Sequence, residues 1–266
     1  MTTGTPATIA PPHVLPAPPV PDPARIALFL DVDGTLLEFA DHPDGVAVDP
    51  SLRMLLASLW RALCGALAPV SGRPLDQVDR LLGLPRSAAA GLHGAELRGA
   101  DGAVSLHVHD GARLSALHRE ALARTSGLGG VLVETKPNGV ALHWRNAPAA
   151  AHAVDEVARA LIEGTGPGFV LQRGDHVIEL KPAGIDKGDA VARLMREPVF
   201  AGRSPWVVGD DHTDEYAFAM AQSLGGNGVV VGPRRPTVAR WALRDPAAVH
   251  GWLVALLAAM PGNGGS

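Results

Sequence analysis

The sequence has very little cysteine and very little lysine. Its 266 residues include a single cysteine, Cys64, so no disulfide framework can hold the fold together. Cys64 lies in a helical pattern with no activating partner nearby in the sequence, and we interpret it as a small buried hydrophobe rather than a reactive thiol. Lysine occurs only at Lys136, Lys181 and Lys187, whereas every other residue with a permanently basic side chain is an arginine. Each lysine therefore marks a position to test for a role that needs a compact ammonium group.

Long apolar runs and a strong charge of one sign are also absent. No run approaches the roughly 18 residues of a membrane span. The formal net charge of −4 gives no reason to expect binding to nucleic acid or to an anionic membrane. We therefore expect neither as a partner.

The first residues of the chain contain eight prolines within 23 positions, and no lysine or arginine precedes Arg25. A secretory signal needs a basic start and an unbroken apolar segment, and this stretch has neither. We expect a disordered, proline-rich leader over residues 1–24, a flexible tail over residues 261–266, and a monomeric cytoplasmic protein.

What the chain does have is an apolar content of 47%, which is enough for a sizeable core. Residues 26–30 form a continuous apolar run, typical of a strand that is covered on both faces. Strand and helix patterns then alternate up to about residue 107, and the same alternation returns from about residue 184. This alternation predicts an α/β fold, with a Rossmann-like core of parallel strands over residues 25–107 and 184–260.

The middle of the sequence follows a different pattern. Residues 108–183 read as helix, hairpin, helix and hairpin, and the first hairpin has a turn signal at Pro137, Asn138 and Gly139. Such a pattern predicts an antiparallel sheet with two helices. We therefore expect an α+β cap domain inserted into the core.

Polar residues follow the predicted core strands, where ligands of an open α/β sheet bind. They are Asp31 and Asp33, then Ser71, then Lys187, and then the stretch GDDHTDE over residues 209–215. Carboxylates gathered at one rim raise each other's pKa, and a hard cation with oxygen ligands, such as Mg²⁺, would relieve the repulsion.

Serine and lysine beside such a cation would form a site for a phosphate dianion. Asp31 is then placed as a nucleophile towards phosphorus. Asp33 can turn back through Gly34 to protonate the leaving oxygen and later to activate water. A rigid buried strand suits this chemistry, because phosphoryl transfer depends mostly on positioning and charge stabilisation.

The motifs DVDGTL, SGR, DKG and GDDHTDE resemble, in this order, the four motifs of the haloacid dehalogenase phosphatase superfamily. The stretches GLHGAE, VETKPNGVALHWR and GDDHTDE further resemble those of trehalose-6-phosphate phosphatases. This resemblance implies a Mg²⁺-dependent hydrolase that releases trehalose and phosphate from trehalose 6-phosphate through an aspartyl-phosphate intermediate. Where the family pattern has His-Tyr-Arg, this chain has His143, Trp144 and Arg145, and so lacks one phenol hydroxyl.

The resemblance also implies roles for individual residues. Asp31 is the nucleophile, Asp33 is the acid and base, and Ser71 and Lys187 bind the phosphoryl oxygens. Mg²⁺ is held by the carboxylates of Asp31 and Asp210 and by the backbone carbonyl of Asp33. Asp211 and Asp214 lie next to these ligands and orient them. Substrate contacts are expected from Gly34, Thr35, Gly72, Arg73, His93, Glu96, Glu134, Lys136, His143 and Arg145.

Three other functions stay open at this point. The core motifs also suit a capped phosphatase or a phosphomutase acting on another sugar phosphate. A receiver-type signalling module uses similar residues, but it is roughly half as long and has no cap. A binding protein without turnover is disfavoured, because both Asp31 and Asp33 are present.

Overall fold

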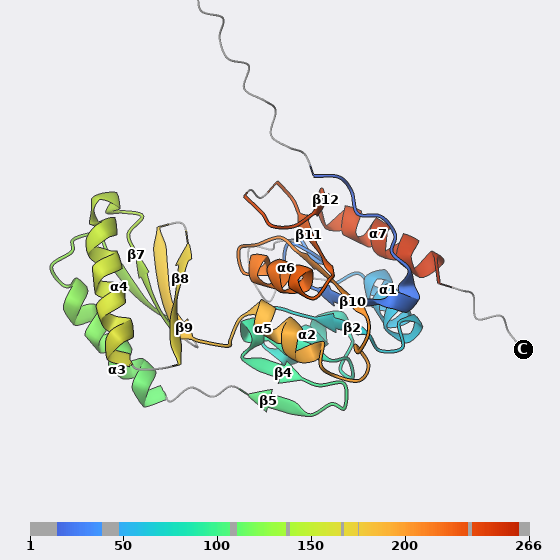
Figure 1. The fold of residues 1–266 in the computed structure, drawn as a ribbon, viewed down its shortest axis with the longest axis horizontal. Helices are drawn as coiled ribbons and strands as arrows, with labels where there is room; N and C mark the ends of the chain where they lie inside the picture. Colours follow the sequence, from blue (N-terminus) through green and yellow to red (C-terminus); the bar gives the residue numbers. More distant parts are fainter. Residues whose placement is uncertain are drawn as a thin grey trace, which may run out of the picture.

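A computed structural model describes residues 15–38, 48–106, 111–136, 139–165, 168–174, 176–233 and 236–260. Figure 1 shows two lobes, a larger one that carries both ends of the chain and a smaller one built from its middle. Each lobe has its own cluster of buried apolar side chains, and the two clusters share no residue. The larger lobe is called the core below, and the smaller lobe is called the cap.

The core is organised around a sheet of five parallel strands in the order β12-β11-β10-β1-β2. The strands are β1 (Ile26–Leu30), β2 (Leu67–Pro69), β10 (Ser204–Gly209), β11 (Asn227–Val231) and β12 (Trp241–Leu243). Strand β1 lies inside this sheet, and all five of its residues are buried. Burial on both faces explains the continuous apolar run, and the predicted α/β fold with a parallel sheet is confirmed.

Helices of the core lie around this sheet (Figure 1). They are α1 (Pro50–Ala62), α2 (Leu75–Leu82), α5 (Lys187–Leu194), α6 (Asp214–Ser223) and α7 (Pro246–Ala258). Helix α5 packs against α6, and α1 against α7. Asp49 caps α1 by accepting a hydrogen bond from the Ser51 N–H at 2.8 Å, and Pro50 takes the first helical position.

A small antiparallel sheet lies beside the parallel one. Its strands are β3 (Ala89–Gly91), β4 (Glu96–Arg98) and β5 (Val104–Leu106). A single bridge between Val70 and Ala90 joins it to the end of β2. Short 3₁₀ helices are η1 (Pro23–Arg25), η3 (Leu92–Gly94) and, in the cap, η4 (Pro148–Ala150).

The cap consists of an antiparallel sheet in the order β6-β7-β9-β8 with two helices on its outer side (Figure 1). Its elements are α3 (Gly111–Thr125), β6 (Leu132–Lys136), β7 (Gly139–His143), α4 (Ala151–Thr165), β8 (Phe169–Gly174) and β9 (Val177–Pro182). The inner face of this sheet is therefore turned towards the core. Of the expected hairpin turn, Gly139 begins β7, whereas Pro137 and Asn138 lie outside the described residues.

The end of the predicted leader is packed rather than disordered. The Pro16 carbonyl accepts a hydrogen bond from the Ala242 N–H at 3.0 Å, and the Pro19 carbonyl accepts one from Trp252 Nε1 at 3.0 Å. Proline has no N–H to donate, but its carbonyl can still pair with the sheet edge and with α7. From Leu15 onward the leader is thus part of the core, while residues 1–14 and 261–266 lie outside the described residues.

The expectation that Cys64 is buried is wrong. Helix α1 ends at Ala62, and Cys64 is exposed in the turn that follows, with a φ of 54°. The left-handed backbone ends the helix and turns the side chain outward. Within the parts of the chain that the structure describes, no helix combines the length and the apolar character needed to cross a membrane.

Candidate active site

The site begins where two neighbouring parallel strands end. Asp31 directly follows β1 and Asp210 directly follows β10, and these strands pair with Leu30 opposite Val208. The Asp31 N–H donates to the Val208 carbonyl at 2.9 Å. The sheet therefore brings together two carboxylates that are 179 residues apart in the sequence numbering, at the edge where α/β folds bind ligands.

Asp214, the first residue of α6, organises the loop between β10 and α6. One carboxylate oxygen, Oδ2, accepts hydrogen bonds at 3.1 Å from the N–H groups of both Asp210 and Asp211. The other, Oδ1, accepts a hydrogen bond from Lys187 Nζ at 2.8 Å. A Cβ atom at Gly209 would lie 2.2 Å from Asp214 Cγ, so this close approach requires glycine.

Carboxylate oxygens of Asp31, Asp210 and Asp214 all lie within 4.8 Å of one another, so this group could hold a metal ion. Both oxygens of Asp214 already accept hydrogen bonds from the protein. Asp31 and Asp210 are therefore the better placed ligands, with Asp214 as the group that orients them. Thr35, which is buried, donates from Oγ1 to Asp210 Oδ1 at 3.2 Å and fixes that carboxylate.

The electrostatics of the group favour a cation. Burial raises the pKa of Asp31 to about 7, although the neighbouring Lys187 ammonium opposes the shift. Burial, followed by the negative charges of Asp214 and Asp211, raises the pKa of Asp210 to about 6. A hard divalent cation would stabilise both carboxylates in their charged form, and carboxylate oxygens are the donors that it prefers. The residues present thus fit Mg²⁺.

Lys187 is the positive centre of the site. It is the first residue of α5, it is only 2% exposed, and its Nζ lies 2.8 Å from Asp31 Oδ1 and 2.8 Å from Asp214 Oδ1. Burial alone would lower its pKa, but Asp31, Asp214 and Asp211 together raise the pKa above its usual value. Lys187 therefore stays charged. The pKa of Asp211, although burial would raise it, falls to about 2 because of Lys187 and of hydrogen bonds from Thr213.

Asp33, the predicted acid and base, is held by Arg73. Arg73 Nε and Nη2 each donate to one carboxylate oxygen of Asp33, both at 2.7 Å. The Arg73 backbone N–H donates to the buried Ser71 Oγ at 3.1 Å. Gly34 has a φ of 74°, a left-handed conformation that lets the chain turn directly after Asp33. The structure thus places Arg73, expected to contact substrate, on the proposed acid and base.

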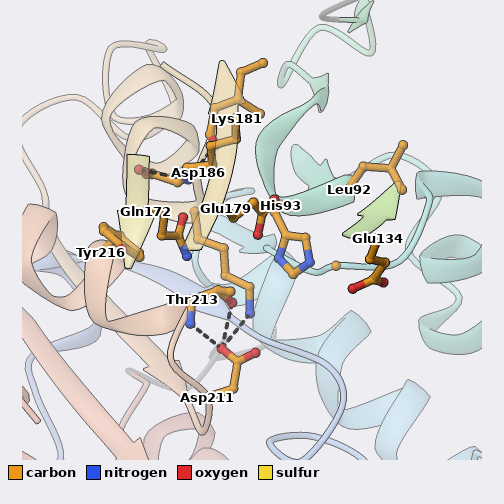
Figure 2. A pocket seen from close by; sticks show the side chains of 13 residues that line it. Leu92, His93, Glu134, Gln172, Glu179, Lys181, Asp186, Asp211, Thr213 and Tyr216 are labelled. Carbon is orange, nitrogen blue, oxygen red and sulfur yellow. Dashed lines mark hydrogen bonds and ion pairs between the residues drawn. The ribbon is translucent and has the colours of Figure 1, made fainter. Parts of the chain in front are cut away.

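Above these residues lies a cavity of about 500 Å³ between the core and the cap (Figure 2). Gly72, His93 and Lys187 line it from the core, and Glu134 lines it from the cap. A Cβ atom at Gly72 would lie 2.6 Å from the His93 ring, so glycine here makes room for the histidine. Lys187, predicted to bind the phosphoryl group, therefore faces the same space as part of the predicted sugar-binding set, whereas the buried Ser71 does not line it.

His143 does not line the cavity itself but supports Glu134. Its Nε2 lies 2.8 Å from Glu134 Oε2, which fixes the direction of the carboxylate. Because His143 and Glu134 come from the neighbouring strands β7 and β6, the sheet holds this pair in place. The side chain of Lys136 lies outside the described residues.

Glu96 and Arg145, which were expected to contact the substrate, do not line the cavity. Glu96 accepts a hydrogen bond from the Leu75 N–H at 2.7 Å, and so caps the start of α2. Arg145 is exposed in the turn after β7. Trp144, at the position of the missing tyrosine, packs against the apolar cluster of the cap, and its ring centroid lies 6.3 Å from that of His176.

The sequence analysis missed several residues that line the cavity, among them Gln172, Glu179, Lys181 and Tyr216. The first three belong to the second cap hairpin, in which Gln172 pairs with Glu179. Glu179 and Lys181 are two residues apart on β9, so their side chains lie on the same face of the sheet. This spacing of two residues, together with the scarcity of lysine, was the sequence signal that could have identified Glu179 and Lys181 as site residues. Tyr216 follows directly on the GDDHTDE motif but gave no signal of its own.

The class of protein follows from four features of this site. They are a parallel sheet in an α/β core, two aspartates after an inner strand, a buried lysine and serine at the same rim, and a cap over the site. Together they define a phosphatase of the haloacid dehalogenase superfamily. Comparison with known proteins narrows this class. The chain belongs to the trehalose-phosphatase family, whose model matches residues 29–247. The resemblance inferred from the motifs is thereby confirmed.

Individual relatives agree with this family. A "probable trehalose-phosphate phosphatase" of Sinorhizobium fredii is 42% identical over 234 residues, covering 86% of this chain and 87% of the relative. The trehalose-6-phosphate phosphatase of Escherichia coli is 38% identical over 240 residues, covering 89% and 88%. The solved trehalose-6-phosphate phosphatase of Aspergillus fumigatus has a TM-score of 0.73 at 23% identity, covering 92% of this chain and 99% of that one, and supports the fold.

Proposed function

We propose that this protein hydrolyses trehalose 6-phosphate to trehalose and inorganic phosphate, with Mg²⁺ as cofactor. The observation that carries the proposal is the contact, at 2.8 Å, between the buried Asp31 and Lys187, which itself lines a cavity whose other wall is the cap. A cavity of about 500 Å³ lies within the range of small-molecule sites. The family and the named activities of the relatives support the choice of substrate.

The chemistry assigned to the core takes two steps. In the first, the Asp31 carboxylate attacks phosphorus, the bond to the sugar oxygen breaks, and Asp33 gives a proton to that oxygen. In the second, Asp33 takes a proton from water, the water oxygen attacks phosphorus, and phosphate leaves Asp31. Arg73 donates to both oxygens of Asp33 and would so hold its carboxyl group in a fixed direction during both proton transfers.

The other core residues supply charge and position. Lys187 and the Ser71 hydroxyl would bind oxygens of the transferred phosphoryl group, with the turn of Gly34 and Thr35 beside them. Asp31 and Asp210 would hold Mg²⁺, with the Asp33 carbonyl as the further ligand that the family implies. When bound, Mg²⁺ neutralises negative charge that develops during transfer.

The cap residues are proposed to bind the disaccharide. Glu134, supported by His143, and the polar side chains of Gln172 and Glu179 present acceptors and donors suited to sugar hydroxyls. Lys136 belongs to the same proposed set through the family pattern. The geometry gives no comparable support to Glu96 and Arg145.

The test is a measurement of phosphate release from a panel of sugar phosphates, with Mg²⁺ and with excess EDTA. We expect trehalose 6-phosphate to show the highest kcat/KM, and EDTA to remove the activity. A higher kcat/KM for another sugar phosphate would show that the substrate is assigned wrongly. A phosphomutase would instead return an isomeric sugar phosphate without free phosphate, which product analysis detects directly.

We also propose domain limits of 25–107 and 184–260 for the core, to which the packed residues 15–24 are added, and 108–183 for the cap, because the two apolar clusters share no residue. The protein is proposed to act as a monomer. Sedimentation equilibrium at micromolar concentration would test this, and a dimer mass would contradict it.

A further inference from the structure

The cavity has a polar wall that the proposed chemistry does not use. It is formed by Tyr216 of the core helix α6 together with Gln172, Glu179 and Lys181 of the cap hairpin. Figure 2 shows Tyr216 on the opposite side of the cavity from Glu134. Tyr216 is the only tyrosine of the chain. The single phenol hydroxyl of the protein therefore lies at the substrate cavity.

The ring of Tyr216 is held on more than one side. Lys181 Nζ lies 5.2 Å from the ring centroid, a cation–π distance, and the His212 ring meets Tyr216 edge-on at 5.8 Å. A Cβ atom at Gly188 would lie 2.6 Å from the Tyr216 carbonyl, so α5 and α6 are closely packed at this residue. The position of the phenol is thus set by the surrounding structure rather than by solvent.

The direction of Tyr216 separates it from the phosphate chemistry. Residues two apart on a helix point about 200° apart. Asp214 is directed towards Lys187, and Tyr216 is directed towards Lys181 of the cap strand β9. Helix α6 therefore contributes one side chain to the phosphoryl site and another to the space under the cap.

The charges around Tyr216 suit a neutral ligand with many hydroxyl groups. Burial, and then the negative charges of Asp186 and Glu179, raise the pKa of the phenol, so it stays protonated. These carboxylates would repel a phosphate at this wall. Lys181 offsets the charge of Asp186, because its Nζ lies 3.7 Å from Asp186 Oδ2, and it also donates to the Ile185 carbonyl at 3.1 Å. Glu179 then remains as the carboxylate that disfavours a phosphate at this wall.

We propose that Tyr216 is a sugar-contacting residue that contributes to specificity for the disaccharide: its hydroxyl forms a hydrogen bond with a hydroxyl group of the sugar part of the substrate. This inference rests on the proposed function. It assigns to the core, and not only to the cap, a share in sugar recognition. In this chain Trp144 stands where the family pattern has a tyrosine. Tyr216 would therefore provide the site with a phenol from another position.

The test uses Tyr216→Phe, which removes the hydroxyl and keeps the ring that Lys181 contacts. Both kcat and KM are measured for trehalose 6-phosphate and for p-nitrophenyl phosphate, which has no sugar. A neutral hydrogen bond present in both the bound and the transition state corresponds to a roughly three- to tenfold change. We expect the ratio of the two kcat/KM values to fall by this factor, mainly through a higher KM for trehalose 6-phosphate.

Trp241→Phe is the matched control. It removes an aromatic N–H that donates to Asn227 Oδ1 at 3.2 Å on the edge strand β12, away from the cavity. The substrate ratio should stay the same in this variant. Tyr216→Leu, which also removes the ring, should lower the ratio further than Tyr216→Phe does.

Three results would overturn the inference. If wild type prefers trehalose 6-phosphate and Tyr216→Phe changes the ratio by less than twofold, the hydroxyl does not contact the sugar, and the proposed function stands. If both substrates lose activity equally and the melting temperature falls, Tyr216 is a structural residue. If wild type shows no preference for trehalose 6-phosphate over other sugar phosphates, the proposed function fails and this inference with it.

Discussion

Replacing Glu134 by alanine should separate sugar recognition from phosphoryl transfer. Glu134 lines the cavity from the cap, and its carboxylate is paired with His143 at 2.8 Å. The two side chains are 42% and 33% exposed. A pair with this exposure contributes only about 0–1 kcal/mol to the free energy of unfolding, so Glu134→Ala should fold normally.

The expected loss of activity is much larger than this loss of stability. Hydrogen bonds to a charged group contribute about 1.5–3 kcal/mol each. Losing one or two of them to sugar hydroxyls lowers kcat/KM for trehalose 6-phosphate by roughly 10- to 25,000-fold. Hydrolysis of p-nitrophenyl phosphate should change far less, because this ester makes no sugar contacts. The two substrates are compared in the same preparation, with thermal unfolding as the check on folding.

The pair formed by His152 and Glu156 offers a control in the same domain. It is also a histidine–glutamate pair, 3.5 Å apart, but it lies on helix α4 with side chains 87% and 68% exposed. Glu156→Ala should leave both activities at the wild-type level. An equal loss for both substrates in Glu134→Ala would refute the reasoning, because the residue would then serve the chemistry or the fold. No loss for either would make Glu134 a solvated hairpin residue.

Three further predictions concern the core. Asp31→Asn should abolish hydrolysis of both substrates in a folded protein, since an amide cannot attack phosphorus; activity within tenfold of wild type would remove Asp31 from this role. Ca²⁺ should inhibit the Mg²⁺-supported reaction, because its longer bonds and higher coordination number disturb the geometry; equal turnover with either ion would contradict the proposed metal site. Arg98→Met should lower the free energy of unfolding, measured in urea titrations, by about 2–4 kcal/mol. The reason is that Asp79 loses the guanidinium that donates to both of its carboxylate oxygens, at 2.7 and 2.8 Å. A loss below about 0.5 kcal/mol, as is typical of surface substitutions, would contradict this prediction.

The sequence by itself determined which polar residues meet at the rim of the core sheet. Asp31 follows a strand whose apolar run shows that both faces are covered, and the order and spacing of the four motifs place Lys187 and Asp210 at the same rim. These features are local, or follow from the rule that parallel strands end at one edge. For that reason the α/β fold and the family could be inferred before any coordinates.

Only the tertiary structure decided which polar side chains share the cavity. Glu96 lies in a stretch typical of the family, yet its carboxylate caps α2. Tyr216 carries no motif, yet it reaches the cavity because α6 packs against α5 and beneath β9. Whether a polar residue meets the substrate or solvent depends on how two lobes with separate apolar cores approach each other. The period of a strand or helix gives the face that a residue occupies, but it does not say what that face meets.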